Sequence, residues 1–87
     1  MVITGSALFI EPGSYQTVVE RLKEFPQVTY QTASDSKTEI VINLEAENQD
    51  ALEELCGRLK DNIPELVDIT HLYINFEEEV DKILGRD

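Results

Sequence analysis

Cationic side chains are scarce in this sequence of 87 residues, which has seven Lys and Arg against eighteen Asp and Glu. The formal net charge of −11 repels nucleic acid and anionic membrane surfaces, because both carry the same sign. Long apolar runs are also absent, so no segment is expected to insert into a membrane. The start of the chain lacks the charged and apolar parts of a signal peptide. We therefore expect a cytoplasmic protein with a basic or apolar partner.

Residues that commonly carry chemistry are equally few. The single cysteine, Cys56, cannot form an internal disulfide, and it falls in an apolar helical stripe that favours a core role over a nucleophile. The single histidine, His71, alternates with Ile69 and Tyr73, which favours a satisfied, partly buried imidazole over a catalytic base. There is no Cys-x-x-Cys pair and no glycine-rich phosphate loop. The sequence thus predicts no enzymatic activity, no cofactor and no metal.

What the chain does contain is two similar halves. "RLKEFPQVTY" begins at Arg21 and "RLKDNIPELVDI" begins at Arg58. In each half an amphipathic helical pattern is followed by a proline, Pro26 or Pro64, which cannot continue a helix. Asn48 is the expected N-cap of the second helix, and Tyr15 to Phe25 form the first. Alternating or β-branched stretches predict strands over residues 2–10, 28–33, 39–45 and 67–76.

Strand, helix and strand thus occur twice in succession, and neither half can bury its apolar face alone. The predicted fold is α+β, the ferredoxin-like split βαβ arrangement, with a four-stranded antiparallel sheet and both helices on one face. Right-handed crossovers place the first and third strands in the middle. We expect a single domain over residues 1–76 and an acidic tail over 77–87. The tail has the spacing of a short amphipathic helix at Phe76, Val80, Ile83 and Leu84.

The sheet face that the helices leave uncovered is the candidate binding surface. In "EIVINLE" the alternation directs Ile40, Ile42 and Leu44 to the helices, with Val41 and Asn43 outward. The small residues of the first strand are assigned to the helix side, and the larger ones face outward: Gly5 and Ala7 inward; Thr4, Ser6 and Leu8 outward. In the last strand Val67, Ile69 and Tyr73 are assigned inward, and Thr70, Leu72 and Ile74 outward.

Such a face mixes aliphatic and small polar side chains inside an acidic rim, which suits a basic amphipathic peptide helix. The same aliphatic residues are also compatible with an ordinary surface or with a dimer interface. An RNA-binding sheet is disfavoured, because the two middle strands offer only Phe9 as an aromatic and no cations. Acylphosphatase-like chemistry would need an arginine after the first strand, where this chain has "EPGS".

The segments "ITGSALFIEP", "FPQVTY", "EIVINLEAEN" and "IPELVDITHLYINFEEE" resemble the NapD family over about residues 2–79. That family comprises small cytoplasmic chaperones of the periplasmic nitrate reductase. The resemblance implies a non-enzymatic protein that binds the twin-arginine signal peptide of a molybdoenzyme precursor as a helix against its sheet, and delays export until the cofactor is in place. Tyr73 matches a family tyrosine, whereas Ile74 stands where a histidine is usual and His71 where an apolar residue is usual.

Combined with the open face, the resemblance predicts a peptide site. Its members are Ser6, Leu8, Val41, Asn43, Thr70 and Leu72 against the apolar side of the peptide, with Glu45 and Glu47 attracting its arginines. We expect a monomer or a weak dimer. A different class also fits the topology: an ACT-like regulatory module that dimerises through its sheet and binds a small molecule, for which Gly13 supplies the glycine after the first strand.

Overall fold

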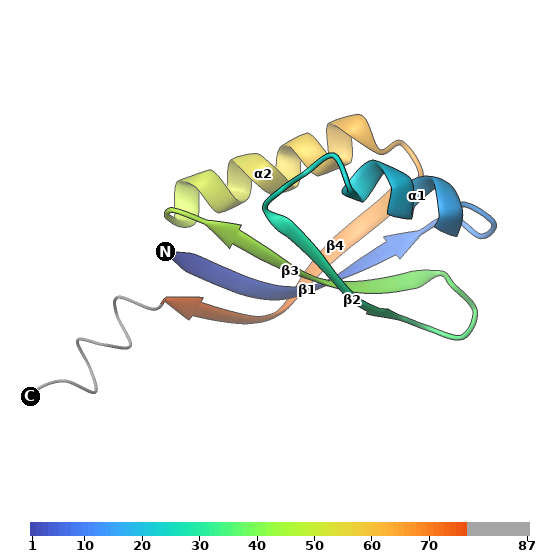
Figure 1. The fold of residues 1–87 in the computed structure, drawn as a ribbon, viewed down its shortest axis with the longest axis horizontal. Coiled ribbons are helices and arrows are strands. Elements are labelled where there is room, and N and C mark those ends of the chain that lie inside the picture. Colours follow the sequence, from blue (N-terminus) through green and yellow to red (C-terminus); the bar gives the residue numbers. More distant parts are fainter. Residues whose placement is uncertain (77–87) are drawn as a thin grey trace, which may run out of the picture.

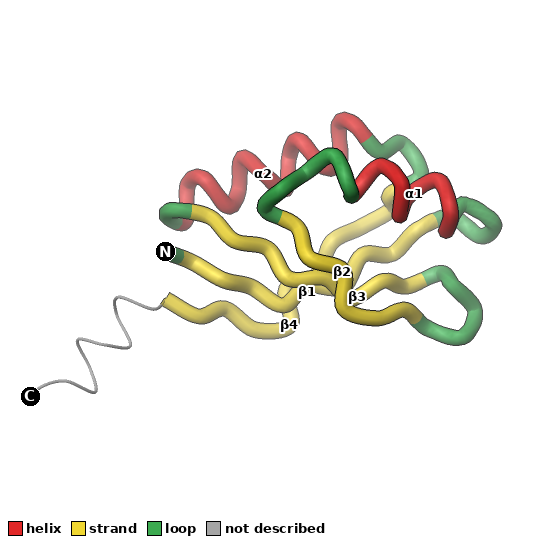
Figure 2. Tube along the Cα trace, viewed as in Figure 1, coloured by secondary structure: helices red, strands yellow, loops and turns green. Residues whose placement is uncertain are grey.

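The computed structural model describes residues 1–76, in which four strands form one layer and two helices form another (Figures 1 and 2). In chain order the elements are β1 (Val2–Ile10), α1 (Tyr15–Leu22), β2 (Val28–Ala33), β3 (Glu39–Ala46), α2 (Gln49–Asn62) and β4 (Leu66–Phe76). All neighbouring strands are antiparallel, in the order β2-β3-β1-β4. The predicted α+β ferredoxin-like arrangement is confirmed. The helix expected in the acidic tail lies outside the described residues.

The helix ends follow local sequence signals. The backbone N–H of Ala51 donates to Asn48 Oδ1 at 2.8 Å, so Asn48 is the N-cap of α2, as predicted. The first helix is shorter than predicted and ends at Leu22 instead of Phe25. The N–H of Phe25 donates to the Leu22 carbonyl, three residues back, in a tight turn before Pro26. The residue before a proline avoids the helical region, so Phe25 does not continue the helix.

A continuous apolar core lies between the helices and the sheet. Ile40, Ile42 and Leu44 of β3 have no exposed surface, which confirms the predicted inward direction. Val18 of α1 and Leu59 of α2 are likewise fully buried against them. Burying each such side chain contributes about 1.5–3 kcal/mol to stability. The core therefore holds the helices on one face of the sheet and leaves the other face open.

Strand β1 has the opposite parity to the predicted one. Directly opposed residues of an antiparallel pair share a face, and Leu8 lies opposite Ile40 while Ser6 lies opposite Ile42. Both β3 partners face the helices, so Ser6 and Leu8 do as well, and both are fully buried. Thr4 follows the same rule. The prediction that places Thr4, Ser6 and Leu8 on the open face is wrong, and Gly5 and Ala7 face outward instead.

Two shifts in the register between β1 and β4 decide the faces of β4. Tyr73 lies opposite Gly5 and His71 opposite Ser6, so Leu72 is an extra residue in a β-bulge. A second shift makes Val67 an extra residue, and it is 63% exposed. Because each bulge interrupts the period of two, the inward placement of Val67 and Tyr73 is wrong.

Of the remaining predicted facing directions in β4, some are confirmed and one is wrong. Ile69 packs against the core, and Thr70 lies opposite Ala7 on the open face, as predicted. Ile74 lies opposite Thr4 and so belongs to the helix side, which contradicts its predicted outward direction. The bulge at Leu72 explains this reversal as well, because it shifts the parity of all later residues.

Candidate functional site

The open face, defined as the sheet surface opposite the helices in Figure 1, is organised in rows across β3, β1 and β4. The rows, in order along β1, are Glu39, Phe9 and Asp68; Val41, Ala7 and Thr70; Asn43, Gly5 and Tyr73; and then Glu45 with Ile3. Successive rows are about 7 Å apart, so the four rows cover about 20 Å along the strands. The sheet thus presents a strip long enough for several turns of a helix.

Tyr73 lies across the middle of this strip. A Cβ atom at Gly5 would overlap the Tyr73 ring, so the ring occupies the space that the missing side chain leaves. The Tyr73 hydroxyl donates to Asn43 Oδ1 at 3.2 Å, which ties β4 to β3 over the top of β1. Half of the Tyr73 surface stays exposed. Tyr73 therefore forms a half-exposed aromatic surface over Gly5.

Carboxylates stand at both ends of the open face, and no cation stands among them. Glu39 and Asp68 share the row of Phe9, and Glu45 shares the row of Ile3. None of the four strands contains Lys or Arg. Within residues 1–76 the ion pair observed is between Glu20 of α1 and Lys23 just after it, on the other side of the molecule. The open face is thus electrostatically complementary to a basic partner.

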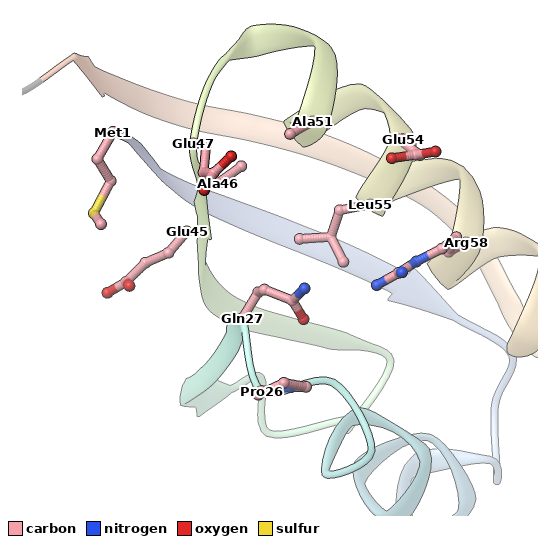
Figure 3. Close-up of a pocket in the computed structure, with 10 residues that line it drawn as sticks. All are labelled: Met1, Pro26, Gln27, Glu45, Ala46, Glu47, Ala51, Glu54, Leu55 and Arg58. Carbon is pink, nitrogen blue, oxygen red and sulfur yellow. The ribbon is translucent and has the colours of Figure 1, made fainter.

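A second concave surface lies beyond the end of β3 and has a volume of about 460 Å³ (Figure 3). Gln27, Leu55 and Arg58 point into it, and Gln27 Oε1 is a buried acceptor without a hydrogen-bond donor in the described part of the chain. Glu47 lines this hollow and not the open face. Glu45 lies at the junction, since it lines the hollow and also belongs to the last row of the open face.

The buried hydroxyls of β1 are satisfied on the helix side. Ser6 Oγ lies 2.8 Å from His71 Nδ1 and 3.1 Å from Thr4 Oγ1. His71 is satisfied, as predicted, but it is exposed and not partly buried, because β4 is an edge strand. Ser6 has no exposed surface, so this Ser–His pair cannot present a nucleophile to a substrate. The pair stabilises the core and does not form a catalytic site.

Cys56 packs against the hydrophobic core from α2, in agreement with its predicted core role. Burial raises the pKa of its thiol, and the charge of nearby Lys60 offsets only part of that increase. The reactive thiolate is therefore less populated at neutral pH than in a free cysteine. This is the opposite of what a catalytic cysteine needs.

The predicted peptide-binding residues are only partly brought together. Val41, Asn43, Glu45 and Thr70 share the open face, and Leu72 is 56% exposed at its bulge. Ser6 and Leu8 lie in the core, and Glu47 lies in the neighbouring hollow. Sequence reasoning missed Ile3, Gly5, Ala7, Phe9 and Tyr73. The pairing of Gly5 with the large Tyr73 ring identifies the open side of β1, but it depends on the register across the bulge at Leu72 and is not visible in the sequence.

A family model described as "NapD protein" matches residues 1–78. The match spans all four strands and both helices. The comparison with curated proteins gives no match. In the described part of the chain no helix is long and apolar enough to cross a membrane, and no group of three or more His, Cys, Asp or Glu side chains is placed to hold a metal ion.

Proposed function

Because the chain belongs to the NapD family, whose members are nitrate reductase maturation chaperones, we propose that it binds the twin-arginine signal peptide of a molybdoenzyme precursor on its open face. Binding takes place in the cytoplasm, with one peptide per protein. It holds back export until the cofactor has been inserted and the enzyme has folded. The expected client is the precursor of the periplasmic nitrate reductase.

The observation that carries this proposal is the size and chemistry of the open face. Its four rows extend over about 20 Å, which matches a helix of about thirteen residues. Gly5 and Ala7 are buried in the central strand, so a peptide helix would contact the side chains that stand beside them, Val41 and the half-exposed Tyr73 ring. The carboxylates at both ends and the absence of strand cations suit a basic, amphipathic peptide.

The two kinds of contact have different roles. Apolar contact with Val41 and the half-exposed Tyr73 supplies most of the affinity, at about 25 cal/mol per Å² before the cost of ordering the peptide. The net charge of −11 mainly raises the association rate and selects basic peptides. While the peptide is bound, its arginines and its apolar segment are covered and cannot engage the export machinery. Release exposes both at once.

The test is calorimetric titration of the protein with a synthetic signal peptide of the nitrate reductase precursor. We compare Thr70→Arg, on the open face, with Thr17→Arg, which changes another exposed threonine, on α1. Thr70→Arg adds bulk and a repelling charge to the site, so we expect its affinity to fall by at least about tenfold, or 1.4 kcal/mol. Thr17→Arg should bind as the unaltered protein does. No heat and no competition at tens of micromolar would refute the proposal.

A further inference from the structure

Phe9 is the most distinctive residue of the open face. It is 37% exposed on the central strand, and its cross-strand partners are Glu39 on β3 and Asp68 on β4. Directly opposed residues have Cβ atoms about 4.5–5.5 Å apart. One aromatic ring is therefore flanked on both sides by a carboxylate, on the same face of the sheet.

Neither carboxylate of this row is neutralised within residues 1–76. The observed ion pair is elsewhere, between Lys23 and Glu20. Asp68 Oδ1 accepts the backbone N–H of Ile69 at 2.9 Å, which holds the carboxylate beside the strand and leaves Oδ2 for an external donor. The row thus combines a partly exposed aromatic ring with two acceptors that carry charge.

This combination suits a guanidinium group better than other cations. A planar guanidinium stacks on an aromatic face and donates in parallel to a carboxylate, whereas an ammonium is a compact point charge without that fork. A divalent metal ion needs more oxygen ligands than two carboxylates provide. Stacking on Phe9 also places the group between Glu39 and Asp68, where both can accept a hydrogen bond.

The opposite end of the open face is different. There Glu45 lies beside the aliphatic Ile3, without an aromatic partner. Between the two ends, the Tyr73 row lies about 13 Å from the Phe9 row, which corresponds to about nine residues of a helix. The two ends of the face are therefore suited to different parts of an amphipathic peptide.

We propose that the row of Glu39, Phe9 and Asp68 binds an arginine of the peptide, so that the basic segment lies at this end and the apolar segment extends over Ala7 toward Tyr73. The inference rests on the proposed function and assigns a polarity to the bound peptide. It also predicts a preference for arginine over lysine at the position that reaches Phe9.

A cycle of protein and peptide variants tests this polarity. The protein variant Glu39→Gln with Asp68→Asn removes two charges and keeps the acceptor for the Ile69 N–H. Its matched control, Glu53→Gln with Asp61→Asn, removes two charges from exposed positions of α2. Each is titrated with the native peptide and with copies in which the arginines are changed to glutamine or to lysine. Thermal unfolding checks that every variant is folded.

We expect the open-face variant to bind the native peptide about tenfold more weakly and the glutamine peptide with little change, because the charged hydrogen bonds are then already lost. The α2 control should show no such coupling. Phe9→Leu should reduce the preference for the arginine peptide over the lysine peptide, since leucine removes the stacking surface while the two carboxylates remain.

Other outcomes overturn the inference. Equal losses for all three peptides would show that the row does not contact the arginines. Coupling to Glu45→Gln in place of Glu39 and Asp68 would put the basic segment at the opposite end of the open face. In both cases the peptide still binds and the proposed function stands. Absence of binding by the unaltered protein would overturn both proposals together.

Discussion

Gly5→Ala should destabilise the protein when Tyr73 is present and should be neutral or stabilising when Tyr73 is replaced by alanine. The alanine Cβ would overlap the Tyr73 ring, whose edge lies over Gly5. The ring is on an edge strand and half exposed, so it can swing away. It then loses the hydrogen bond to Asn43 and its contact with β1.

The magnitude follows from these two losses. A hydrogen bond of this kind contributes about 1 kcal/mol. A half-buried tyrosine covers about 100 Å², which is worth about 2.5 kcal/mol as an upper limit. Replacing a strand glycine by alanine also stabilises the protein by about 0.5–1 kcal/mol, because alanine lowers the conformational entropy of the unfolded chain. Gly5→Ala should therefore destabilise the protein by about 1–3 kcal/mol.

The assay is urea unfolding of Gly5→Ala, Tyr73→Ala and the double variant. In the Tyr73→Ala background the overlap no longer exists, so Gly5→Ala should be neutral or stabilising by up to about 1 kcal/mol. Gly57→Ala is the control, because nothing lies within 4 Å of a Cβ there. It should stabilise α2 by about 0.5–1 kcal/mol in either background. If Gly5→Ala were equally harmful without Tyr73, the ring would not be the reason for the glycine.

Two further substitutions and one labelling experiment test other parts of the structure. Asn48→Ala removes the acceptor for the Ala51 N–H, and urea unfolding should show a loss of about 1 kcal/mol. Leu8→Ala should cost about 2–5 kcal/mol in the same assay, because Leu8 is fully buried; a loss below 0.5 kcal/mol, as is usual for a surface site, would contradict the assigned face of β1. Cys56 should react with iodoacetamide more slowly in the folded protein than in urea at neutral pH, because burial raises the pKa of its thiol, and the rate should rise as the pH increases. Equal rates in the two states would refute this.

Much of the fold could be predicted from local patterns. The alternation of Ile40, Ile42 and Leu44 with more exposed residues is strong enough to identify β3 and its buried face. Pro26 and Pro64 mark the ends of the two helical segments, since proline cannot donate to the helix ladder. The order of the strands then follows from the right-handed crossover rule, which needs no side-chain detail.

The candidate site was harder to predict, because several of its residues come from β1 and β4. These strands lack a clear alternation of apolar and polar residues that would show which side chains are buried. In β1, the polar residues Thr4 and Ser6 share a face with Leu8, while Ala7 faces the other way. Assigning the small residues to the helix side, as the prediction did, therefore gives the wrong side. The two hydroxyls are tolerated in the core because they are hydrogen-bonded: Ser6 to Thr4, and Ser6 also to His71.

The sequence by itself determined the elements, their order and the acidic character of the chain, because these depend on periodicity, helix-ending residues and composition. Only the tertiary structure decided which residues of β1 and β4 face outward. The register between two strands and the bulge at Leu72 depend on how the partners fit, and one extra residue reverses every later side chain. The row of Glu39, Phe9 and Asp68 exists only because three segments, far apart in the chain, pair in that register.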